Sequence, residues 1–253
     1  MKQDGLQIYR EHLGAIKNAK TTKDDLCDPE KQNWFPYPFL GAMKPGTRLR
    51  YRRNNEMYFA GRKEFSKVLD KVRELRWTGV EEGEMVSKEL YLNGTLGYGK
   101  SHYMCALAFL LLREGKRAIF LPEAEGLIRL QFEYFCHSLN LAFADDDTVL
   151  DEIESCTTKE DFQTLSETLA RSGVRMYFLL DQANAFDDES GVSRSQGQRR
   201  RDTLDWFDSI TGEHFLILSA SGTYRKAAKA RLTQENVAKM DFFGGLNDVC
   251  TKT

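Results

Sequence analysis

The chain has 253 residues, with Lys+Arg 36 against Asp+Glu 38, a formal net charge of −2 and a hydrophobic share of 41%. This length and composition are those of one large globular domain, or of a main domain with an appendage. A charge so close to zero creates no long-range attraction to nucleic acid or to an anionic membrane, so any such contact must come from local patches.

Neither a membrane span nor a secretory signal is expected from the sequence. The most apolar run, Met104 to Leu112, is far shorter than the roughly 20 residues of a spanning helix. Residues 1–20 mix charges with scattered apolar side chains and have no apolar centre, so we expect a protein that starts in a reducing cytosol. The cysteines are odd in number and form no C-x-x-C pair, which favours buried thiols over disulfides or zinc. They are Cys27, Cys105, Cys136, Cys156 and Cys250.

Residues 1–54 are predicted to form a helix followed by an extended arm. Apolar residues at helical spacing predict the amphipathic helix; they are Leu6, Tyr9, Leu13 and Ile16. Four prolines crowd residues 29–47, which predicts an extended or turning connector because proline fixes its own φ and disfavours helix before it. Aromatic rings alternate with these prolines, which favours an arm packed on a core over a ligand groove. These rings belong to Trp34, Phe35, Tyr37 and Phe39.

Residues 55–253 are predicted to form an α/β domain. An amphipathic helix is expected from about Arg62 to Trp77. Strands then alternate with helices, which is typical of a parallel sheet flanked by crossover helices. The predicted strands are Glu89–Leu92, Ala118–Leu121, Met176–Leu180 and Phe215–Leu218, and the predicted helices are Lys100–Arg113, Glu125–Leu139, Lys159–Arg171 and Arg201–Ser209. Residues 187–200 are rich in Ser, Gly and charge, which predicts an exposed and mobile loop.

A phosphate-binding loop is the strongest functional signal. Residues 94–101, Gly-Thr-Leu-Gly-Tyr-Gly-Lys-Ser, match G-x-x-x-x-G-K-[ST] between a predicted strand and a predicted helix. The glycines leave room for backbone N–H groups to surround a phosphate, and the positive end of the helix dipole faces it. Lys100 is expected to reach the β- and γ-phosphates, and Ser101 to hold Mg²⁺. The predicted nucleotide-binding residues are Gly94, Thr95, Leu96, Gly97, Tyr98, Gly99, Lys100, Ser101 and His102.

An acidic residue follows the apolar run of residues 176–180. Asp181 ends this predicted strand, where it would bind Mg²⁺ through the metal's water shell; the alternative is a capping Asp. Gln182 stands where many ATPases with an additional central strand carry Glu. A neutral amide can orient the attacking water but cannot take its proton, which predicts slow turnover. The alternative is that Gln182 only hydrogen-bonds a neighbouring loop.

Other polar groups allow more than one interpretation. Ser219 and Ser221, at the end of the predicted strand 215–218, are candidates to sense the γ-phosphate, with plain turn chemistry as the alternative. Two arginine clusters, at 199–201 and 48–53, could contact nucleic acid, offer an arginine finger to a neighbouring subunit, or be solvated charge. Residues 145–147, three consecutive Asp, lack the spacing and glycine of a calcium loop and are interpreted as a helix start.

These segments together resemble the P-loop NTPase module of Crinkler effectors and retrotransposon-hot-spot proteins. The resemblance covers roughly residues 55–250. It is carried by residues 94–101, by Phe178 to Ala185 with its Asp-Gln-x-Asn ending, by Ser219 to Ser221, and by Asp241 to Gly245. The ubiquitin-like header and the nuclease-like domain of Crinkler proteins have no counterpart in these residues.

The resemblance implies a P-loop NTPase that binds ATP with Mg²⁺ and hydrolyses it. It assigns phosphate and Mg²⁺ to Lys100 and Ser101, the Mg²⁺ water shell to Asp181, and the attacking water to Gln182. It also implies secretion and action in a host nucleus.

Three functions are therefore open at the level of sequence. The expected one is slow, Mg-dependent ATP hydrolysis by an effector module. The alternatives are a nucleotide-gated module that binds a host protein without meaningful turnover, and a DNA-binding effector fragment that uses the arginine clusters. An arginine finger would require a homo-oligomer. No recognised motif in the sequence indicates a preference for ATP or GTP.

Overall fold

The structure is a computed structural model, and it describes residues 3–42, 55–76, 87–95, 97–187, 193–220 and 237–242. Its strands are β1 (Gln32–Pro36), β2 (Glu56–Ala60), β3 (Glu89–Gly94), β4 (Arg117–Leu121), β5 (Met176–Leu180), β6 (Phe215–Ser219) and β7 (Val237–Phe242). Its α-helices are α1 (Gln3–Lys17), α2 (Lys23–Cys27), α3 (Glu64–Glu74), α4 (Lys100–Arg113), α5 (Ala124–Leu130), α6 (Phe132–Ala142), α7 (Asp147–Ser155), α8 (Lys159–Arg171) and α9 (Arg194–Thr211). A short 3₁₀ helix, η1, covers Ala183–Phe186.

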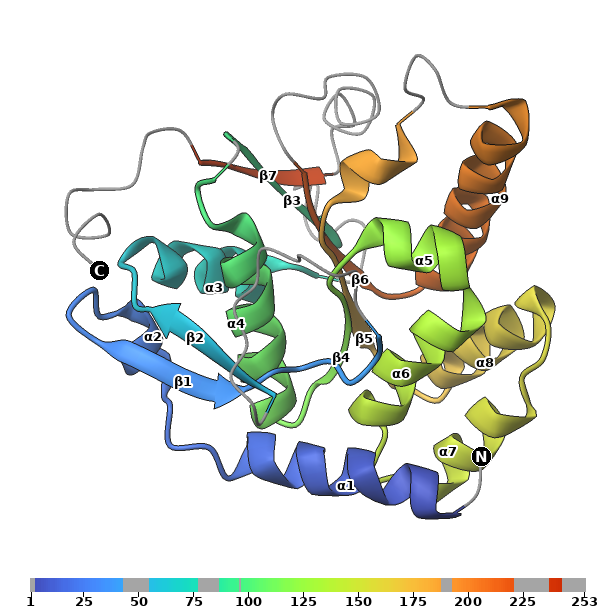
Figure 1. Ribbon diagram of the computed structural model, residues 1–253, viewed down its shortest axis with the longest axis horizontal. Coiled ribbons are helices and arrows are strands. Elements are labelled where there is room, and N and C mark those ends of the chain that lie inside the picture. Colours follow the sequence, from blue (N-terminus) through green and yellow to red (C-terminus); the bar gives the residue numbers. More distant parts are fainter. Residues whose placement is uncertain are drawn as a thin grey trace.

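A five-stranded parallel sheet forms the centre, in the order β4-β5-β6-β3-β7, and confirms the predicted α/β fold. In Figure 1, α3 and α4 lie to the left of this sheet, and α5, α6, α8 and α9 lie to its right. The four predicted strands are β3 to β6, and the helices predicted over residues 100–113 and 159–171 are α4 and α8. The sequence did not predict β7, in which only the first and last residues are buried.

The strand order determines which chain segments meet. Strand β6 lies between β3 and β5, with Leu92 opposite Ser219 and Leu218 opposite Leu180. Because all five strands are parallel, the segments that follow their carboxyl ends lie at one edge of the sheet. The loop after β3 and the Asp after β5 are therefore neighbours at that edge, one strand apart.

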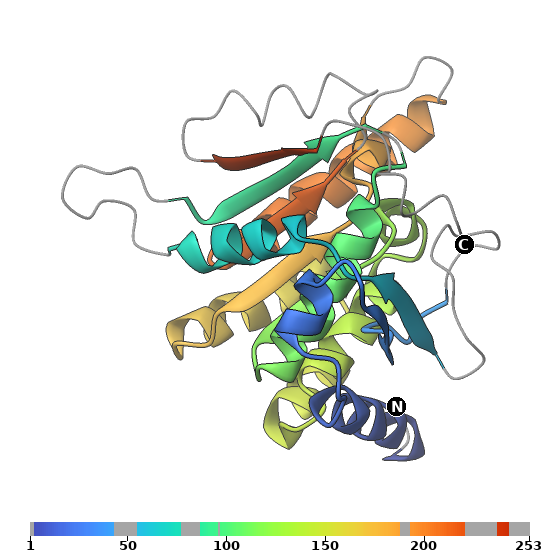
Figure 2. The same cartoon turned by 90° about the vertical axis from the view of Figure 1, so that its left-hand side faces the viewer.

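Helix α4 is buried along almost its whole length because N-terminal elements cover the side that faces away from the sheet. Figure 2 shows α1 and the antiparallel pair β1–β2 beside it. Phe35 stacks on Phe109 of α4 with 4.3 Å between ring centroids, and Phe39 lies 4.8 Å from Tyr134 of α6. These contacts confirm the prediction that the aromatic arm packs on a core.

The helix predicted over residues 125–139 is two helices, α5 and α6. Gln131 interrupts it with φ 38° and ψ −104°, outside the helical region. The break lets α5 fold back on α6 so closely that a Cβ at Gly126 would collide with the ring of Tyr134. The Gln131 side chain donates to the hydroxyl of Thr203 in α9 at 3.2 Å, so tertiary contacts compensate the lost helical geometry.

The prediction of a loop over residues 187–200 is wrong for its second half. Helix α9 begins at Arg194, seven residues before the predicted start. Ser193 and Gln196 form a capping box, in which the Gln196 N–H donates to the Ser193 hydroxyl at 3.3 Å. This pattern stabilises a helix start despite the polar composition that suggested a loop. The arginines at 199–201 therefore lie on a helix.

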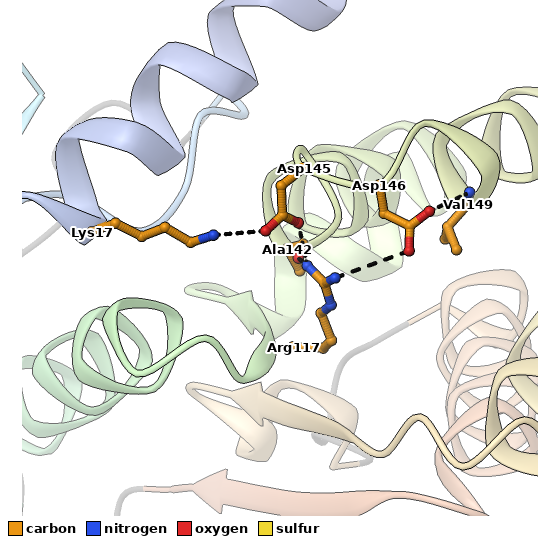
Figure 3. A network of polar contacts seen from close by, with 6 residues as sticks. All are labelled: Lys17, Arg117, Ala142, Asp145, Asp146 and Val149. Carbon is orange, nitrogen blue, oxygen red and sulfur yellow. Dashed lines mark hydrogen bonds and ion pairs between the residues drawn. The ribbon is translucent and has the colours of Figure 1, made fainter.

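The Asp cluster at residues 145–147 begins a helix, as predicted. Asp146 caps α7 by accepting a hydrogen bond from the Val149 N–H at 3.2 Å. Figure 3 shows that Asp145 also bridges two cations, Lys17 of α1 and Arg117 of β4, with 2.6 Å between Lys17 Nζ and Asp145 Oδ2. The cluster thus ties α1 to the sheet edge. In the part of the chain that the structure describes, no group of His, Cys, Asp or Glu could hold a metal ion by itself.

The cysteines confirm the predicted burial in part. Cys105 is fully buried, whereas Cys27, Cys136 and Cys156 are half-buried, and all four are free thiols. Cys250 lies outside the described residues. Across the described ranges, no helix has the length and apolar character that crossing a membrane requires.

A buried histidine that the sequence analysis passed over links three elements. His214 is fully buried; its Nδ1 accepts from the Met176 N–H at 3.2 Å, and its Nε2 lies 2.9 Å from the Ser166 hydroxyl. With Nδ1 as an acceptor, the neutral tautomer carries its proton on Nε2. Burial lowers the pKa of His214 from 6.5 to about 4.

Acidification is expected to destabilise the fold through His214. The unfolded chain takes up a proton below pH 6.5 while the folded imidazole stays neutral to about pH 4, so the free energy of unfolding falls between these values. The loss for one such histidine is up to about 3 kcal/mol. Urea unfolding at pH 7 and pH 5 measures it. His214→Gln should flatten the pH dependence, and an unchanged slope in this variant would contradict the assignment.

Candidate functional site

The loop between β3 and α4 has the backbone that the phosphate-binding motif requires. Gly94, Gly97 and Gly99 have φ values of 152°, 86° and 87°, which other residues rarely adopt. At Gly94 a Cβ would also collide with the carbonyl oxygen of Phe242. The glycine spacing therefore follows from backbone geometry and close packing. Leu96 lies outside the described residues.

Strand β7 supports this loop from the side. The Thr95 N–H donates to the Phe242 carbonyl at 3.2 Å, and the Asn93 side chain donates to Asp241 Oδ1 at 3.0 Å. Asp241 and Phe242 begin one of the segments that carry the family resemblance. Their structural role is to hold the end of β3 and the first residue of the loop in place.

Lys100, the motif lysine, points back into its own loop. Its side chain is buried, and Nζ donates to the carbonyl oxygens of Gly94 and Thr95, both at 2.8 Å. Burial lowers the pKa of Lys100, and the negative charge of Asp181 partly offsets this effect. The ammonium group therefore lies within the loop, close to the position that a bound phosphate would occupy.

Asp181 is a buried carboxylate with one satisfied oxygen and one unsatisfied oxygen. It is 1% exposed, and its Oδ1 accepts from the Gln182 N–H at 2.9 Å and from the Ser219 hydroxyl. Its Oδ2 is buried and receives no hydrogen bond of normal geometry from any residue that the structure describes. Desolvation raises the pKa of Asp181, and the hydroxyls of Ser101 and Ser219 partly offset the increase.

A buried carboxylate oxygen without a donor is costly unless a ligand or ion completes it. Two residues of the motif, Ser101 and Lys100, lower the pKa of Asp181 and therefore lie near its carboxylate. This arrangement fits a divalent cation held between Ser101 and Asp181.

Ser219 is one of the two predicted phosphate sensors, and the structure gives it a defined contact. It is buried at the end of β6, and its hydroxyl donates to Asp181 Oδ1. Ser219 thus lies between the phosphate-binding loop and Asp181, and it orients the carboxylate. Its sensing role stays a prediction, and Ser221 lies outside the described residues.

Gln182 has an unusual backbone conformation and an exposed side chain. Its φ of 60° and ψ of 40° are left-handed, a conformation that costs a non-glycine residue about 1 kcal/mol or more. This conformation directs its N–H to Asp181 Oδ1. The Gln182 side chain makes no hydrogen bond to another residue within the described ranges, so the alternative of a bond to a neighbouring loop has no support there.

His102 lies in the first turn of α4, where its N–H donates to the Gly99 carbonyl at 2.9 Å. Burial, together with the nearby charge of Arg62, lowers the pKa of His102 from 6.5 to about 4. The imidazole is therefore neutral at pH 7. It can offer a hydrogen bond or ring contact to a nucleotide, but no positive charge.

Two residues at this edge were missed by the sequence analysis. Arg62, between β2 and α3, donates from Nη1 to the Tyr98 carbonyl at 2.8 Å; because it lies outside any motif, no sequence signal identifies it. Glu123 is buried after β4, and the next residue, Ala124, donates its N–H to the Asp181 carbonyl at 3.0 Å. Glu123 lies two residues after the end of a predicted strand, and this position is the sequence signal that could have identified it.

The arginines at 199–201 make contacts within the protein. The guanidinium groups donate to the carbonyl oxygens of Arg129 and Asp187 and to the Gln198 side chain. These contacts hold the three guanidinium groups against the protein, and a contact with nucleic acid or a role as an arginine finger stays a prediction. The second arginine cluster, at 48–53, lies outside the described residues.

The strand order and the loop define the class of protein. A parallel sheet with the glycine-rich loop after β3, an acidic residue after β5 and an additional strand between them is a P-loop NTPase fold of the type with an additional central strand.

Comparisons with known proteins add little to this assignment. No protein-family model matches the sequence, and no curated protein matches it. The structure is similar to PCH-2 of C. elegans, with a TM-score of 0.39 and 16% identity over 78% of this chain and 44% of that chain. It is also similar to the pCW3 conjugation coupling protein TcpA, in its monomer form with ATPgS, with a TM-score of 0.32 and 11% identity. That match covers 72% of this chain and 61% of TcpA, so the chain spans less than two thirds of either protein.

Proposed function

We propose that this protein binds Mg-ATP in the loop of residues 94–101 and hydrolyses it slowly, as a module of a Crinkler-like effector. The observation that carries the nucleotide proposal is the unsatisfied Oδ2 of Asp181, buried beside the motif residues Lys100 and Ser101. The glycine conformations of the loop support it independently.

The residues present fit both the cation and the phosphates. Mg²⁺ prefers oxygen ligands and keeps several waters, and a hydroxyl with a nearby carboxylate is the usual protein contribution. Ser101 and Asp181 would supply these groups. When bound, Mg²⁺ neutralises charge on the β- and γ-phosphates.

The chain's own groups have three tasks in this proposal. The loop amides bind the phosphates, and Lys100 exchanges the carbonyls of Gly94 and Thr95 for phosphate oxygens. Ser219 keeps the Asp181 carboxylate in one orientation. Gln182 orients the attacking water without accepting its proton, which limits the rate.

Calorimetric titration with ATP, GTP and ADP, each with and without Mg²⁺, tests the binding step, and phosphate release tests turnover. We expect Mg-dependent binding of the triphosphate and slow release of phosphate. Absence of binding by any Mg-nucleotide at millimolar concentration would contradict the proposal. GTP and ATP are compared because no described residue identifies the base.

The exposed side chain of Gln182 favours a second candidate, a nucleotide-gated interaction module without meaningful turnover. In such a module, bound ATP would change a surface that a host protein recognises. The Crinkler-like role itself rests on the residues that carry the resemblance, above all the Asp-Gln-x-Asn ending at 181–184. Capture of a host protein in the presence of ATP but not of ADP would support the gated module.

Gln182→Glu tests the water-positioning role of this residue, on which slow hydrolysis depends. A carboxylate at this position can accept the proton of the attacking water, so turnover is expected to rise by roughly 10- to 100-fold. Single-turnover phosphate release is the measurement, and Gln182→Ala is the matched control that removes the amide without adding a base. No increase with Glu would count against the water-positioning role of this residue.

A further inference from the structure

Arg62 joins the N-terminal part of the chain to the phosphate-binding loop. Its Nη1 donates to the Tyr98 carbonyl at 2.8 Å, and its guanidinium carbon lies 5.3 Å from the centroid of the Tyr103 ring. A Cβ at Gly99 would lie 2.7 Å from Nη1, so the guanidinium also occupies the space beside that glycine. One side chain thus contacts the last two residues of the loop before Lys100 and the first turn of α4.

The backbone of Arg62 is held just as closely by other elements. Its N–H donates to the Leu26 carbonyl of α2 at 2.9 Å, and its carbonyl accepts from the Phe65 N–H at 2.9 Å. The preceding residue, Gly61, donates to the Lys31 carbonyl at 3.0 Å and has no room for a Cβ against the Asp28 carbonyl. The side chain therefore starts from a tightly packed junction, defined here as residues 56–62 together with α2.

The charge of Arg62 acts on the same region. Burial raises the pKa of Tyr103 and the charge of Arg62 partly offsets this rise, whereas at His102 burial and the charge of Arg62 both lower the pKa. Arg62 thus adds a positive charge near the start of α4, in addition to Lys100. The guanidinium is half-buried, so this charge is only partly screened by water. Its contact with the Tyr98 carbonyl fixes the orientation of the peptide that precedes Gly99.

We propose that Arg62 is a positioning residue of the nucleotide site, through which the junction and the phosphate-binding loop stabilise each other. This inference rests on the proposed function, because it assigns a partner to the same loop. A phosphate binds the loop only when its amides converge, and Arg62 holds the Tyr98–Gly99 peptide in the observed conformation. Coupling between two sites is reciprocal, so nucleotide binding should in turn stabilise the junction.

Two measurements on the full chain test the proposal. Calorimetry with Mg-ATP should give an affinity roughly 10-fold lower for Arg62→Gln, with a smaller loss for Arg62→Lys, which keeps the charge but not the planar group. Arg73→Gln is the matched control and should bind like the wild type. Arg73 lies on the following helix, and among the described residues its one ion pair is with the exposed Glu114 at 3.7 Å.

Hydrogen exchange provides a readout that a merely structural role would not produce. In the wild type, Mg-ATP should slow exchange of the amides in residues 23–27 and 56–62, and this protection should vanish in Arg62→Gln. Wild-type protein that binds Mg-ATP without any change in these amides would overturn the proposal. So would Arg62→Gln protein that binds within twofold of the wild type.

The two kinds of failure can be told apart. If the wild type binds no nucleotide, the proposed function fails and the coupling fails with it. If nucleotide binds but the junction does not respond, only the role of Arg62 is wrong. Should Arg62→Gln not fold, as thermal unfolding without nucleotide would show, hydrogen exchange of the wild type alone decides.

Discussion

Replacing Lys100 by Ala is expected to remove nucleotide binding, with an affinity lower by roughly 30- to 1,000-fold, or about 2–4 kcal/mol. The physical reason is the position of the ammonium group, which lies inside the loop at 2.8 Å from two of its carbonyl oxygens. Calorimetry with Mg-ATP measures the loss, and phosphate release should fall with it. The fold should persist, because strand β7 also holds the start of the loop, through the hydrogen bond from the Thr95 N–H to the Phe242 carbonyl.

Lys67→Ala is the matched control for this experiment. Lys67 is an exposed residue of α3, so its removal changes the net charge by the same amount without touching the loop. Its affinity should equal that of the wild type. An equal loss in both variants would mean that Lys100 acts only through general attraction, and full affinity in Lys100→Ala would exclude the loop as the phosphate site.

Replacing Asp181 by Asn is expected to separate stability from activity. Turnover should fall by roughly 100-fold or more, because the neutral amide cannot orient a divalent cation as the carboxylate does. The dependence of ATP affinity on Mg²⁺ should weaken for the same reason. Calorimetry across a series of Mg²⁺ concentrations, together with phosphate release, measures both effects.

The same variant should be more stable than the wild type in the absence of Mg²⁺. The pKa of Asp181 is raised in the folded state, mainly by desolvation. A carboxyl with a raised folded pKa contributes its full stability below the unfolded value, and this contribution is lost as the pH rises through the folded value. At neutral pH the buried charge therefore lowers the free energy of unfolding, and the neutral Asn removes this penalty.

Thermal unfolding at pH 7 without Mg²⁺ tests this expectation. Asp181→Asn should unfold at a higher temperature than the wild type, and the difference should shrink toward pH 4. Asp205→Asn, on the exposed face of α9, is the control and should change neither stability nor activity. A lower unfolding temperature for Asp181→Asn would show that the carboxylate stabilises the empty site.

Much of the fold could be predicted because its signals are local. The apolar runs of β4 and β5 and the caps of α7 and α8 each encode their element within a few residues. The missed first turns of α9 carry a local signal, the capping box of Ser193 and Gln196, whereas two other errors occurred where distant contacts decide. Gln131 leaves the helical region where α5 packs back on α6. Residues 237–242 form a strand because they pair in parallel with β3.

The candidate site divides in the same way. The amino-acid sequence by itself determined the phosphate-binding loop and the acid after β5, since glycines, Lys-Ser and a strand-ending Asp are contiguous patterns with direct chemical meaning. Only the tertiary structure decided that β6 separates them, that Ser219 donates to Asp181, and that Arg62 reaches the loop from 36 residues away. These contacts join residues with no regular spacing, so they arise only when the strands are ordered and the N-terminal junction is packed.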